Sequence, residues 1–313
     1  MNTFYRPLLK IILSVFFVLA IAPDLHAGKK IGVIMTGDIP YYGAIHKAFV
    51  DEINKKFAGG ERIEIILQRP FPNSISWSNA ARKLIAFDVD LIVTYGSPAT
   101  LSVIHEKSSI PLVYSGFYEP EEQSVSSTKN VTGCGFRVPL SSILRYFRRV
   151  KNINTLGVVF SSIEEDSVRQ FETMKQLTGQ QGIKIEKIDI QAQSDLNKLK
   201  NQQSDVVFIT GSSLAHLWLN DLVTILEKQQ VPVADIFPDE NEAGVLMTLF
   251  QPSQTQGEMA AEMAWQILQG TKPADIAPYT LRDTELVFNL VEARRLGIDF
   301  PIQLLIEATR VIE

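Results

Sequence analysis

Cysteine and histidine are scarce in this chain, and their scarcity limits its chemistry. Cys134 is the only cysteine among 313 residues, so no disulfide can form within the chain. It stands between two glycines, and we expect a small buried hydrophobic residue in a tight Gly-Cys-Gly turn. The four histidines are far apart in the sequence, so the pattern does not indicate a metal site. We expect no metal and no cofactor.

Clusters of basic residues are also missing. The chain has 30 Lys and Arg against 35 Asp and Glu, a formal net charge of −5, and no basic run. Because proteins that bind nucleic acids concentrate Lys and Arg on one surface, we expect no nucleic-acid partner.

An apolar run stands at the start of the chain. Residues 11–21 are almost entirely apolar, follow Arg6 and Lys10, and precede a small residue at Ala27. This pattern predicts a signal peptide over residues 1–27, cleaved near Ala27, and therefore export to the periplasm. The run is shorter than the roughly 20 residues that span a bilayer; an uncleaved anchor is the alternative.

Signatures of catalysis are absent as well. Gly133-Cys134-Gly135 does not complete a GxGxxG motif, and the sequence has no Walker motif, HExxH or CxxC. Neither Ser97 nor Ser212 stands in a GxSxG elbow. We therefore expect a protein that is not an enzyme.

A pair of carboxylates is the one catalytic arrangement that the sequence leaves open. Asp38, Glu119 and Asp239 follow strand-like runs and could converge as a glycosidase pair, but nothing marks out two of them. An exported hydrolase is thus an alternative reading.

What the chain does have is a regular alternation of strand-like and helix-like segments. In the first half we expect strands at 30–36, 62–67, 91–95 and 111–115, and helices at 42–56, 76–87 and 99–106. In the second half we expect strands at 155–160, 183–188, 205–210, 231–234 and 245–250, and helices at 141–150, 164–178, 195–200, 214–228 and 255–268. Continuous Val, Ile and Leu runs favour parallel strands covered by helices on both faces.

This repetition predicts an α/β fold of two doubly wound parallel-sheet lobes that face each other across a cleft. The first lobe is expected to hold residues 28–139 with about 251–282. The second is expected to hold 140–250 with about 283–313.

Two of the expected strand ends lead directly into a helix start. Ligands of open parallel sheets collect beyond the carboxyl ends of strands. Gly96, Ser97 and Pro98 follow the third strand, and Gly211, Ser212 and Ser213 follow a strand of the second lobe. Glycine permits close approach, and a helix start with Ser or Pro leaves N–H groups that attract an anion. Each would be an ordinary cap by itself, but two at equivalent points indicate a carboxylate site.

Other residues at the strand ends complete the expected site. The aromatic ones are Tyr41, Tyr42, Tyr95, Phe117 and Tyr118, of which we expect at least two to pack within their own lobe. The polar ones are Asp38, Ser161, Ser162, Asp239 and Glu240. Asp239 or Glu240 is expected to pair with a ligand ammonium group; a solvated acidic loop is the alternative.

Several longer motifs carry a family resemblance. They are DLIVTYGSPA at 90–99, IPLVY at 110–114, NVTG at 130–133, GTKPADI at 270–276, ELVFNL at 285–290 and ARRLGI at 293–298. Over essentially the whole mature chain, their order and spacing resemble those of ABC-transporter substrate-binding proteins of the tryptophan- and tyrosine-type family.

The resemblance implies a type I periplasmic-binding-protein fold. A small solute, best an aromatic or branched amino acid, would be closed between the lobes and delivered to a membrane permease by a monomer. A periplasmic sensor without a permease is the runner-up.

The chain departs from the family pattern in four places. Glu119 replaces the usual Asp of an Asp-Pro pair, and Ser161-Ser162 replaces Asn-Pro. Residues 210–213 replace Pro-Thr-Asp-Asn, and residues 237–242 replace a stretch of small residues. Three of the four lie in the second lobe, so the resemblance leaves the ligand open.

Overall fold

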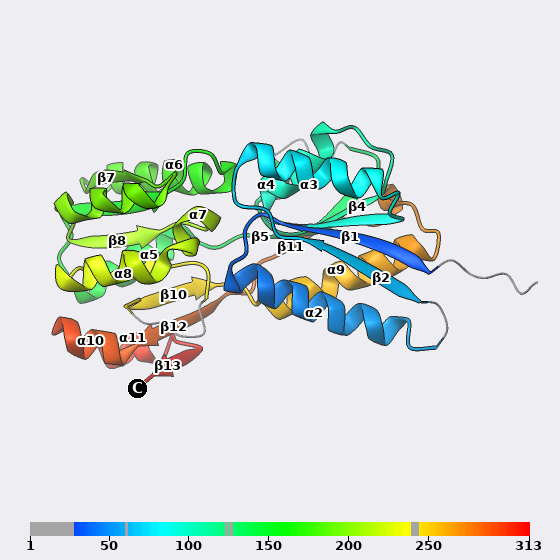
Figure 1. Ribbon diagram of the computed structural model, residues 1–313. Helices are drawn as coiled ribbons and strands as arrows, with labels where there is room; N and C mark the ends of the chain where they lie inside the picture. Colours follow the sequence, from blue (N-terminus) through cyan, green and yellow to red (C-terminus); the bar gives the residue numbers. More distant parts are fainter. Residues whose placement is uncertain (1–27, 60–61, 123–124, 126–127, 239–243) are drawn as a thin grey trace, which may run out of the picture.

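The computed structural model describes residues 28–313 except 60–61, 123–124, 126–127 and 239–243. The predicted signal peptide, Asp239 and Glu240 lie outside the described residues. Figure 1 shows two lobes side by side, each with a sheet between helices.

The first lobe contains a six-stranded sheet in the order β11-β5-β4-β3-β1-β2, with every neighbouring pair parallel. Its strands are β1 (Lys29–Met35), β2 (Ile63–Gln68), β3 (Leu91–Tyr95), β4 (Leu112–Tyr118), β5 (Val131–Phe136) and β11 (Tyr279–Leu281). Its helices are α2 (Pro40–Lys56), α3 (Ser74–Ala86), α4 (Ser97–His105) and α9 (Ser253–Leu268), with the 3-10 turns η1 (Pro120–Glu122) and η4 (Pro273–Asp275). Helices α2 and α9 pack together below the sheet in Figure 1, and α3 and α4 above it.

The second lobe contains a seven-stranded sheet in the order β13-β12-β10-β9-β8-β6-β7. Only β10 and β12 pair antiparallel among its neighbouring strands. Its strands are β6 (Thr155–Phe160), β7 (Lys184–Asp189), β8 (Val206–Ile209), β9 (Val233–Asp235), β10 (Met247–Phe250), β12 (Glu285–Asn289) and β13 (Arg310–Ile312). Its helices are α5 (Leu140–Val150), α6 (Glu165–Gly179), α7 (Ser213–Leu217), α8 (Leu219–Lys228), α10 (Leu290–Leu296) and α11 (Ile302–Leu305), with the 3-10 segment η3 (Gln193–Asn201).

Burial on both faces explains why the strands are parallel and apolar throughout. In β1, Ile31, Val33 and Met35 join the core under α2 and α9, whereas Ile34 joins the core under α3 and α4. Each such buried side chain stabilises the fold by about 1.5–3 kcal/mol relative to exposure. The prediction of a two-lobed α/β fold with parallel-dominated sheets is confirmed.

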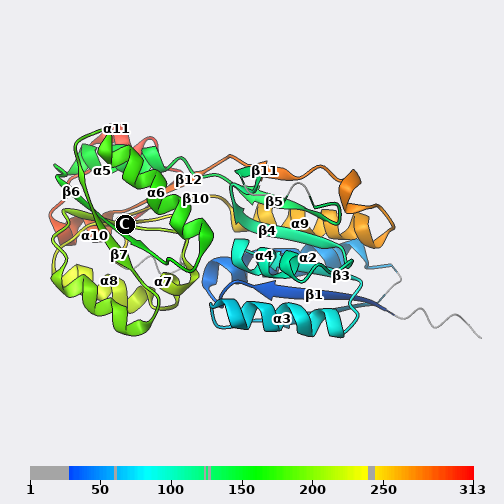
Figure 2. The ribbon, with the colours of Figure 1, turned by 90° about the horizontal axis from the view of Figure 1, so that it is seen from above.

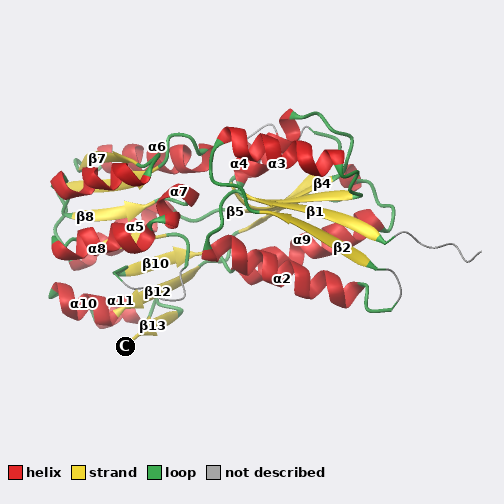
Figure 3. Ribbon diagram, viewed as in Figure 1, coloured by secondary structure: helices red, strands yellow, loops and turns green. Residues whose placement is uncertain are grey.

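The chain passes between the lobes three times: from β5 to α5, from β10 to α9, and from β11 to β12 (Figures 2 and 3). The carboxyl ends of β1 to β5 in the first lobe, and of β6 to β10 in the second, point toward the other lobe (Figure 1). Residues that follow those ends therefore meet where the lobes touch.

The prediction of a tight turn at Gly133-Cys134-Gly135 was wrong, because these residues lie within strand β5. A Cβ atom at Gly133 would collide with the backbone oxygen of Tyr114, and one at Gly135 with the ring of Pro120. These glycines serve close packing against β4 and η1. Cys134 is fully buried, as expected.

Two other local predictions differ from the structure. The expected helix at 214–228 is divided into α7 and α8 at Trp218, whose φ of −118° and ψ of 25° interrupt the helical ladder. The expected helix at 195–200 is the 3-10 segment η3. In addition, β4 continues to Tyr118 past a register shift at Gly116, so Phe117 lies inside the strand.

Candidate ligand site between the lobes

The start of helix α4 forms the first-lobe side of the candidate site. Gly96 caps the helix with φ 89°, and a Cβ atom there would lie 2.5 Å from Thr36 Oγ1 and from Tyr42 Oη. Only glycine meets both the backbone and the packing demand. Ser97 follows, is fully buried, and its Oγ has no hydrogen-bond partner within the described chain. Pro98 is also buried.

Asp166 reaches from the second lobe to this point. Its Oδ2 accepts a hydrogen bond from the backbone N–H of Tyr118 at 3.2 Å, across the lobe boundary. Ser97 Oγ lies close enough to the carboxylate to lower its pKa without meeting hydrogen-bond geometry. Burial raises the pKa of Asp166 to about 6, although the charge of Arg169 opposes the shift.

Arg169 on α6 completes an interlobe clamp with Asp166. It donates to Asp166 Oδ1 at 2.8 Å, to the backbone oxygen of Glu119 at 3.1 Å, and to that of Tyr118. Glu119 has φ 47°, in the left-handed region, and its carboxylate pairs with Arg137 at 2.8 Å. We call Asp166 and Arg169 the clamp; it holds the end of β4 against α6.

Aromatic rings from both lobes stack between the sheets. Tyr41 lies parallel to Phe237, with ring centroids 4.0 Å apart and an interplanar angle of 13°. Phe136 and Tyr42 contact the same Phe237 ring at 6.3 and 5.8 Å. The Tyr41 hydroxyl accepts a 2.7 Å bond from Gln256 Nε2. Phe237 was not among the predicted site residues, because it lies inside a segment that read as a departure from the family pattern.

Three of the predicted first-lobe residues lie apart from this stack. Tyr95 is fully buried and its hydroxyl contacts His46 Nδ1 at 3.1 Å. Phe117 packs on Tyr114 in the core under α3 and α4. Asp38 is exposed, 3.7 Å from the guanidinium of Arg69.

The second-lobe helix start is occupied by a carboxylate of the chain itself. Glu164 is buried, and it accepts from Ser212 Oγ at 2.7 Å, from the Ser213 N–H at 2.8 Å and from the Leu214 N–H at 3.0 Å. Burial raises the pKa of Glu164, although these hydrogen bonds oppose the shift. The sequence predicted a ligand carboxylate at Ser212 and Ser213; in the structure the side chain of Glu164 takes these donors.

The sequence analysis did not predict Glu164 and Asp166, because neither residue directly follows a strand end. Both belong to the start of α6, four and six residues after β6 ends at Phe160. Burial, and then the charges of Glu164 and Asp166, raise the pKa of Tyr42, which shows how near the two acids are to the first lobe.

The remaining second-lobe predictions divide between the interior and the surface. Ser161 is fully buried, whereas Ser162 is exposed and bonds Asp189 at 2.8 Å. Gly211 donates its N–H to Gln170 Oε1 at 2.7 Å, and a Cβ atom there would lie 2.8 Å from the Phe237 ring.

A buried histidine stands behind the second-lobe wall. His216 Nδ1 lies 2.6 Å from the Ser212 oxygen, and Nε2 lies 3.0 Å from Asp235 Oδ2. Burial lowers the pKa of His216, but the charge of Asp235 and the hydrogen bonds together raise it above its ordinary value. Because both ring nitrogens face oxygen acceptors, the imidazolium satisfies them best.

Four atoms of buried residues near the lobe boundary have no hydrogen-bond partner within the described residues. They are the Oγ atoms of Ser97, Ser161 and Ser213 and the Nε2 atom of Gln170, all in fully buried residues. Two of them, Ser97 Oγ and Ser213 Oγ, lie beside Asp166 and Glu164. Buried polar atoms in native proteins are nearly always satisfied, so these two hydroxyls can also serve a ligand.

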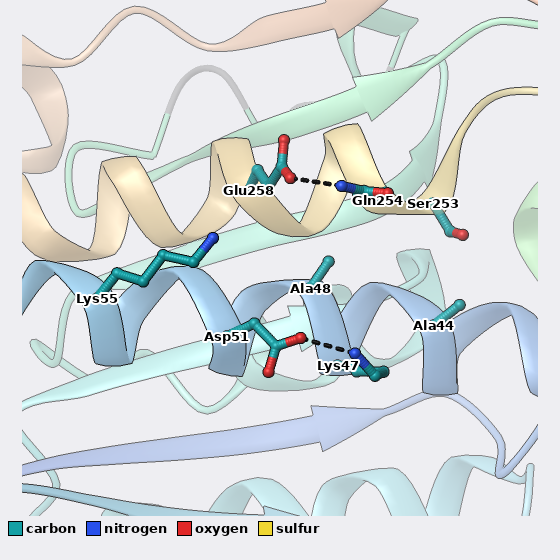
Figure 4. A pocket seen from close by; sticks show the side chains of 8 residues that line it. All are labelled: Ala44, Lys47, Ala48, Asp51, Lys55, Ser253, Gln254 and Glu258. Atoms are coloured by element: carbon teal, nitrogen blue, oxygen red, sulfur yellow. Dashed lines mark hydrogen bonds and ion pairs between the residues drawn. The ribbon is translucent and has the colours of Figure 1, made fainter.

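The hollows outside this centre include two of more than 300 Å³. One, of about 370 Å³, borders the clamp at the edge of the lobes and is lined among others by Tyr118, Arg137, Leu140 and Leu177. The other, of about 320 Å³, runs between α2 and α9 on the first lobe (Figure 4). Within it, Lys47 pairs with Asp51 and Gln254 with Glu258.

Comparison with known proteins decides the family. The model of the ABC transporter substrate binding protein family matches residues 69–312, more than half of the chain. The chain belongs to this family. It is therefore an ABC-type solute-binding protein.

Individual relatives are distant in sequence but similar in fold. The tyrosine-binding protein of Clostridioides difficile is 19% identical over 276 residues, 85% of this chain and 80% of the relative. An ABC domain in complex with L-Trp from Streptococcus pneumonia has a TM-score of 0.84 at 21% identity, covering 91% of this chain and 100% of that one. A ligand-free, open substrate-binding protein from Clostridium difficile has a TM-score of 0.63 at 22% identity, covering 91% and 99%.

Among the described residues, none of the helices combines the length and apolar character needed to cross a bilayer. The same residues contain no cluster of three or more His, Cys, Asp or Glu placed to hold a metal ion.

Proposed function

We propose that this solute-binding protein captures a small α-amino acid, aromatic or branched, between its lobes and delivers it to a membrane ABC permease. The observation that carries the proposal is the pair of unsatisfied buried hydroxyls beside Glu164 and Asp166, those of Ser213 and Ser97, together with the stack of Tyr41 on Phe237. An amino acid has an ammonium group that donates hydrogen bonds, a carboxylate that accepts them, and a side chain that can pack on the aromatic rings.

The start of α4 is the proposed carboxylate site. Ser97 Oγ lies there on the first lobe, and a helix end attracts an anion by about 0.3–1 kcal/mol. The two acids at the start of α6 supply the counter-charge for an ammonium group. Tyr41, Tyr42 and Phe237 are positioned to cover an apolar or aromatic side chain.

Ligand capture in this scheme is a closing motion without chemistry. A ligand that contacts both walls shifts the population toward the closed arrangement by its differential contacts. The structure has direct interlobe contacts, including the clamp and the aromatic stack. Its higher TM-score with the L-Trp complex than with the open relative agrees with lobes that are closed.

The relatives support an amino acid as the solute, because their names mention tyrosine and L-Trp. Their identity to this chain is low, so the supporting argument rests on the site. We further propose that the chain acts as an exported monomer and that it is not an enzyme.

Titration calorimetry with the mature chain tests the proposal. The panel holds the aromatic and branched amino acids together with purines and small carboxylic acids. Saturable binding of at least one amino acid is expected, and mass spectrometry of solute carried through native purification should identify the same compound. Saturable binding of purines alone would contradict the amino-acid assignment.

A further inference from the structure

Acidic side chains outnumber basic ones on the second-lobe wall. Glu164, Asp166 and Asp235 are buried there beside two basic residues, Arg169 and His216. Arg169 pairs with Asp166 and His216 with Asp235, whereas Glu164 is held by a hydroxyl and two N–H groups. Among the described residues of this wall, Glu164 is therefore the acid without a basic partner.

The position of Glu164 decides which ligand group the wall can accept. Its two oxygens take both N–H groups at the start of α7 and the Ser212 hydroxyl, which are the donors that a ligand carboxylate would need. A second carboxylate placed beside it would meet like charge in a buried setting, which costs several kcal/mol. An ammonium group would instead balance the charge.

An unsatisfied polar atom of the second lobe marks where that group would lie. Ser213 Oγ is beside Glu164, whose pKa it helps to lower. This hydroxyl is fully buried and lacks a hydrogen-bond partner within the described chain, so it is available to a ligand amine.

We propose that Glu164 determines the specificity of the ligand site: it fills the helix end that a ligand carboxylate would use and, with Asp166, makes the second-lobe wall a receptor for a ligand amine. This proposal rests on the proposed function and specifies how the solute is oriented between the lobes. The amine of the solute is indispensable and faces the second lobe, whereas its carboxylate contributes less. The ligand class is therefore primary amines with an apolar or aromatic body, amino acids included.

Matched ligands test this on the unaltered chain. Titration calorimetry compares L-tryptophan with tryptamine, which lacks the carboxylate, and with 3-indolepropionate, which lacks the amine. L-leucine, isopentylamine and 4-methylpentanoate form a parallel set. In the set whose amino acid binds, we expect the amine to bind within about tenfold of the amino acid, and the deaminated acid to bind at least about 30-fold more weakly.

The variant Glu164→Gln keeps the size of the side chain and removes its charge. This variant should bind the amino acid more weakly. The affinity for the amino acid divided by the affinity for the deaminated acid should fall at least about tenfold. Glu165→Gln is the matched control, because Glu165 is the exposed neighbour in the same turn of α6. If Glu164→Gln does not fold, Asp166→Asn provides the second variant, with the same expected direction.

The outcomes separate this proposal from the function beneath it. A deaminated acid that binds as tightly as its amino acid overturns the role of Glu164 and leaves amino-acid capture intact. An affinity ratio that Glu164→Gln leaves unchanged does the same. If no amino acid in the panel binds, the proposed function fails, and this proposal fails with it.

Discussion

Asp166 makes the stability of this protein depend on pH in a direction opposite to that of an ordinary ion-paired carboxylate. Burial at the lobe boundary raises its pKa from 3.8 to about 6 in the folded chain. Between these two values the folded chain binds a proton more tightly than the unfolded chain does. The contribution of Asp166 therefore increases stability as the pH falls through 6, and is lost as the pH rises above it.

The size of the effect follows from the two pKa values. The full difference corresponds to about 3 kcal/mol, because one pKa unit is worth about 1.36 kcal/mol. Between pH 7.5 and pH 5 only part of the titration occurs, and Asp166 should add roughly 1 kcal/mol to the free energy of unfolding. Glu164 acts in the same direction, whereas Glu262 and Glu307, whose pKa values are lowered, act in the opposite one.

A variant isolates Asp166 from these other groups. Urea unfolding, followed by tryptophan fluorescence, is measured for the natural chain and for Asp166→Asn at pH 7.5 and pH 5. The stability of the natural chain relative to the variant should rise by roughly 1 kcal/mol on going to pH 5. The exposed neighbour supplies the control, since Glu165→Gln should not produce this rise. A difference that is constant, or that falls toward pH 5, would refute the reasoning.

Three further predictions concern the clamp, the glycine cap and the aromatic stack. Arg169→Gln removes charged bonds to the end of β4, so the ligand-free chain should open and its radius of gyration from X-ray scattering should increase; an unchanged radius argues against a clamp. Gly96→Ala should lower the free energy of unfolding by about 1–3 kcal/mol and weaken ligand binding, because φ at Gly96 is 89° and neighbouring atoms fill the space that a Cβ atom would need. Gly179→Ala is the control and should have neither effect, because the space around Gly179 is open. Phe237→Ala should weaken binding of an aromatic amino acid at least about tenfold by calorimetry, more than it weakens binding of a small one, since it removes the ring stacked on Tyr41.

Much of the fold follows from local sequence patterns. The continuous apolar runs at 31–35 and 91–95 predicted strands buried on both faces, and their alternate residues do reach two different cores. Local signals also failed in identifiable places. The glycines around Cys134 look like turn residues, yet they are required by the neighbouring strand and by η1, which no local pattern reveals. The helix is also interrupted at Trp218, where the sequence has no Gly or Pro that would predict a break.

The candidate site was predicted less completely than the fold. Strand ends and helix starts indicated Tyr41, Tyr42 and Ser97, which the structure places at the lobe boundary. That these residues bind the solute stays a prediction. Glu164 and Asp166 carried no signature, because an acid in the first turn of a helix is ordinary, and only its surroundings make it unusual.

By itself, the sequence determined which segments become strands and helices and that the strand ends carry glycine, hydroxyl and aromatic residues. These properties depend on side-chain periodicity and backbone preference over a few neighbouring residues. The tertiary structure alone decided which anion occupies which helix end. Glu164 meets Ser213 from 49 residues away, and Asp166 meets Tyr118 from 48 residues away across the lobe boundary. Such pairs form only when segments far apart in the sequence are brought together, because the charge and burial of each carboxylate depend on every element packed around it.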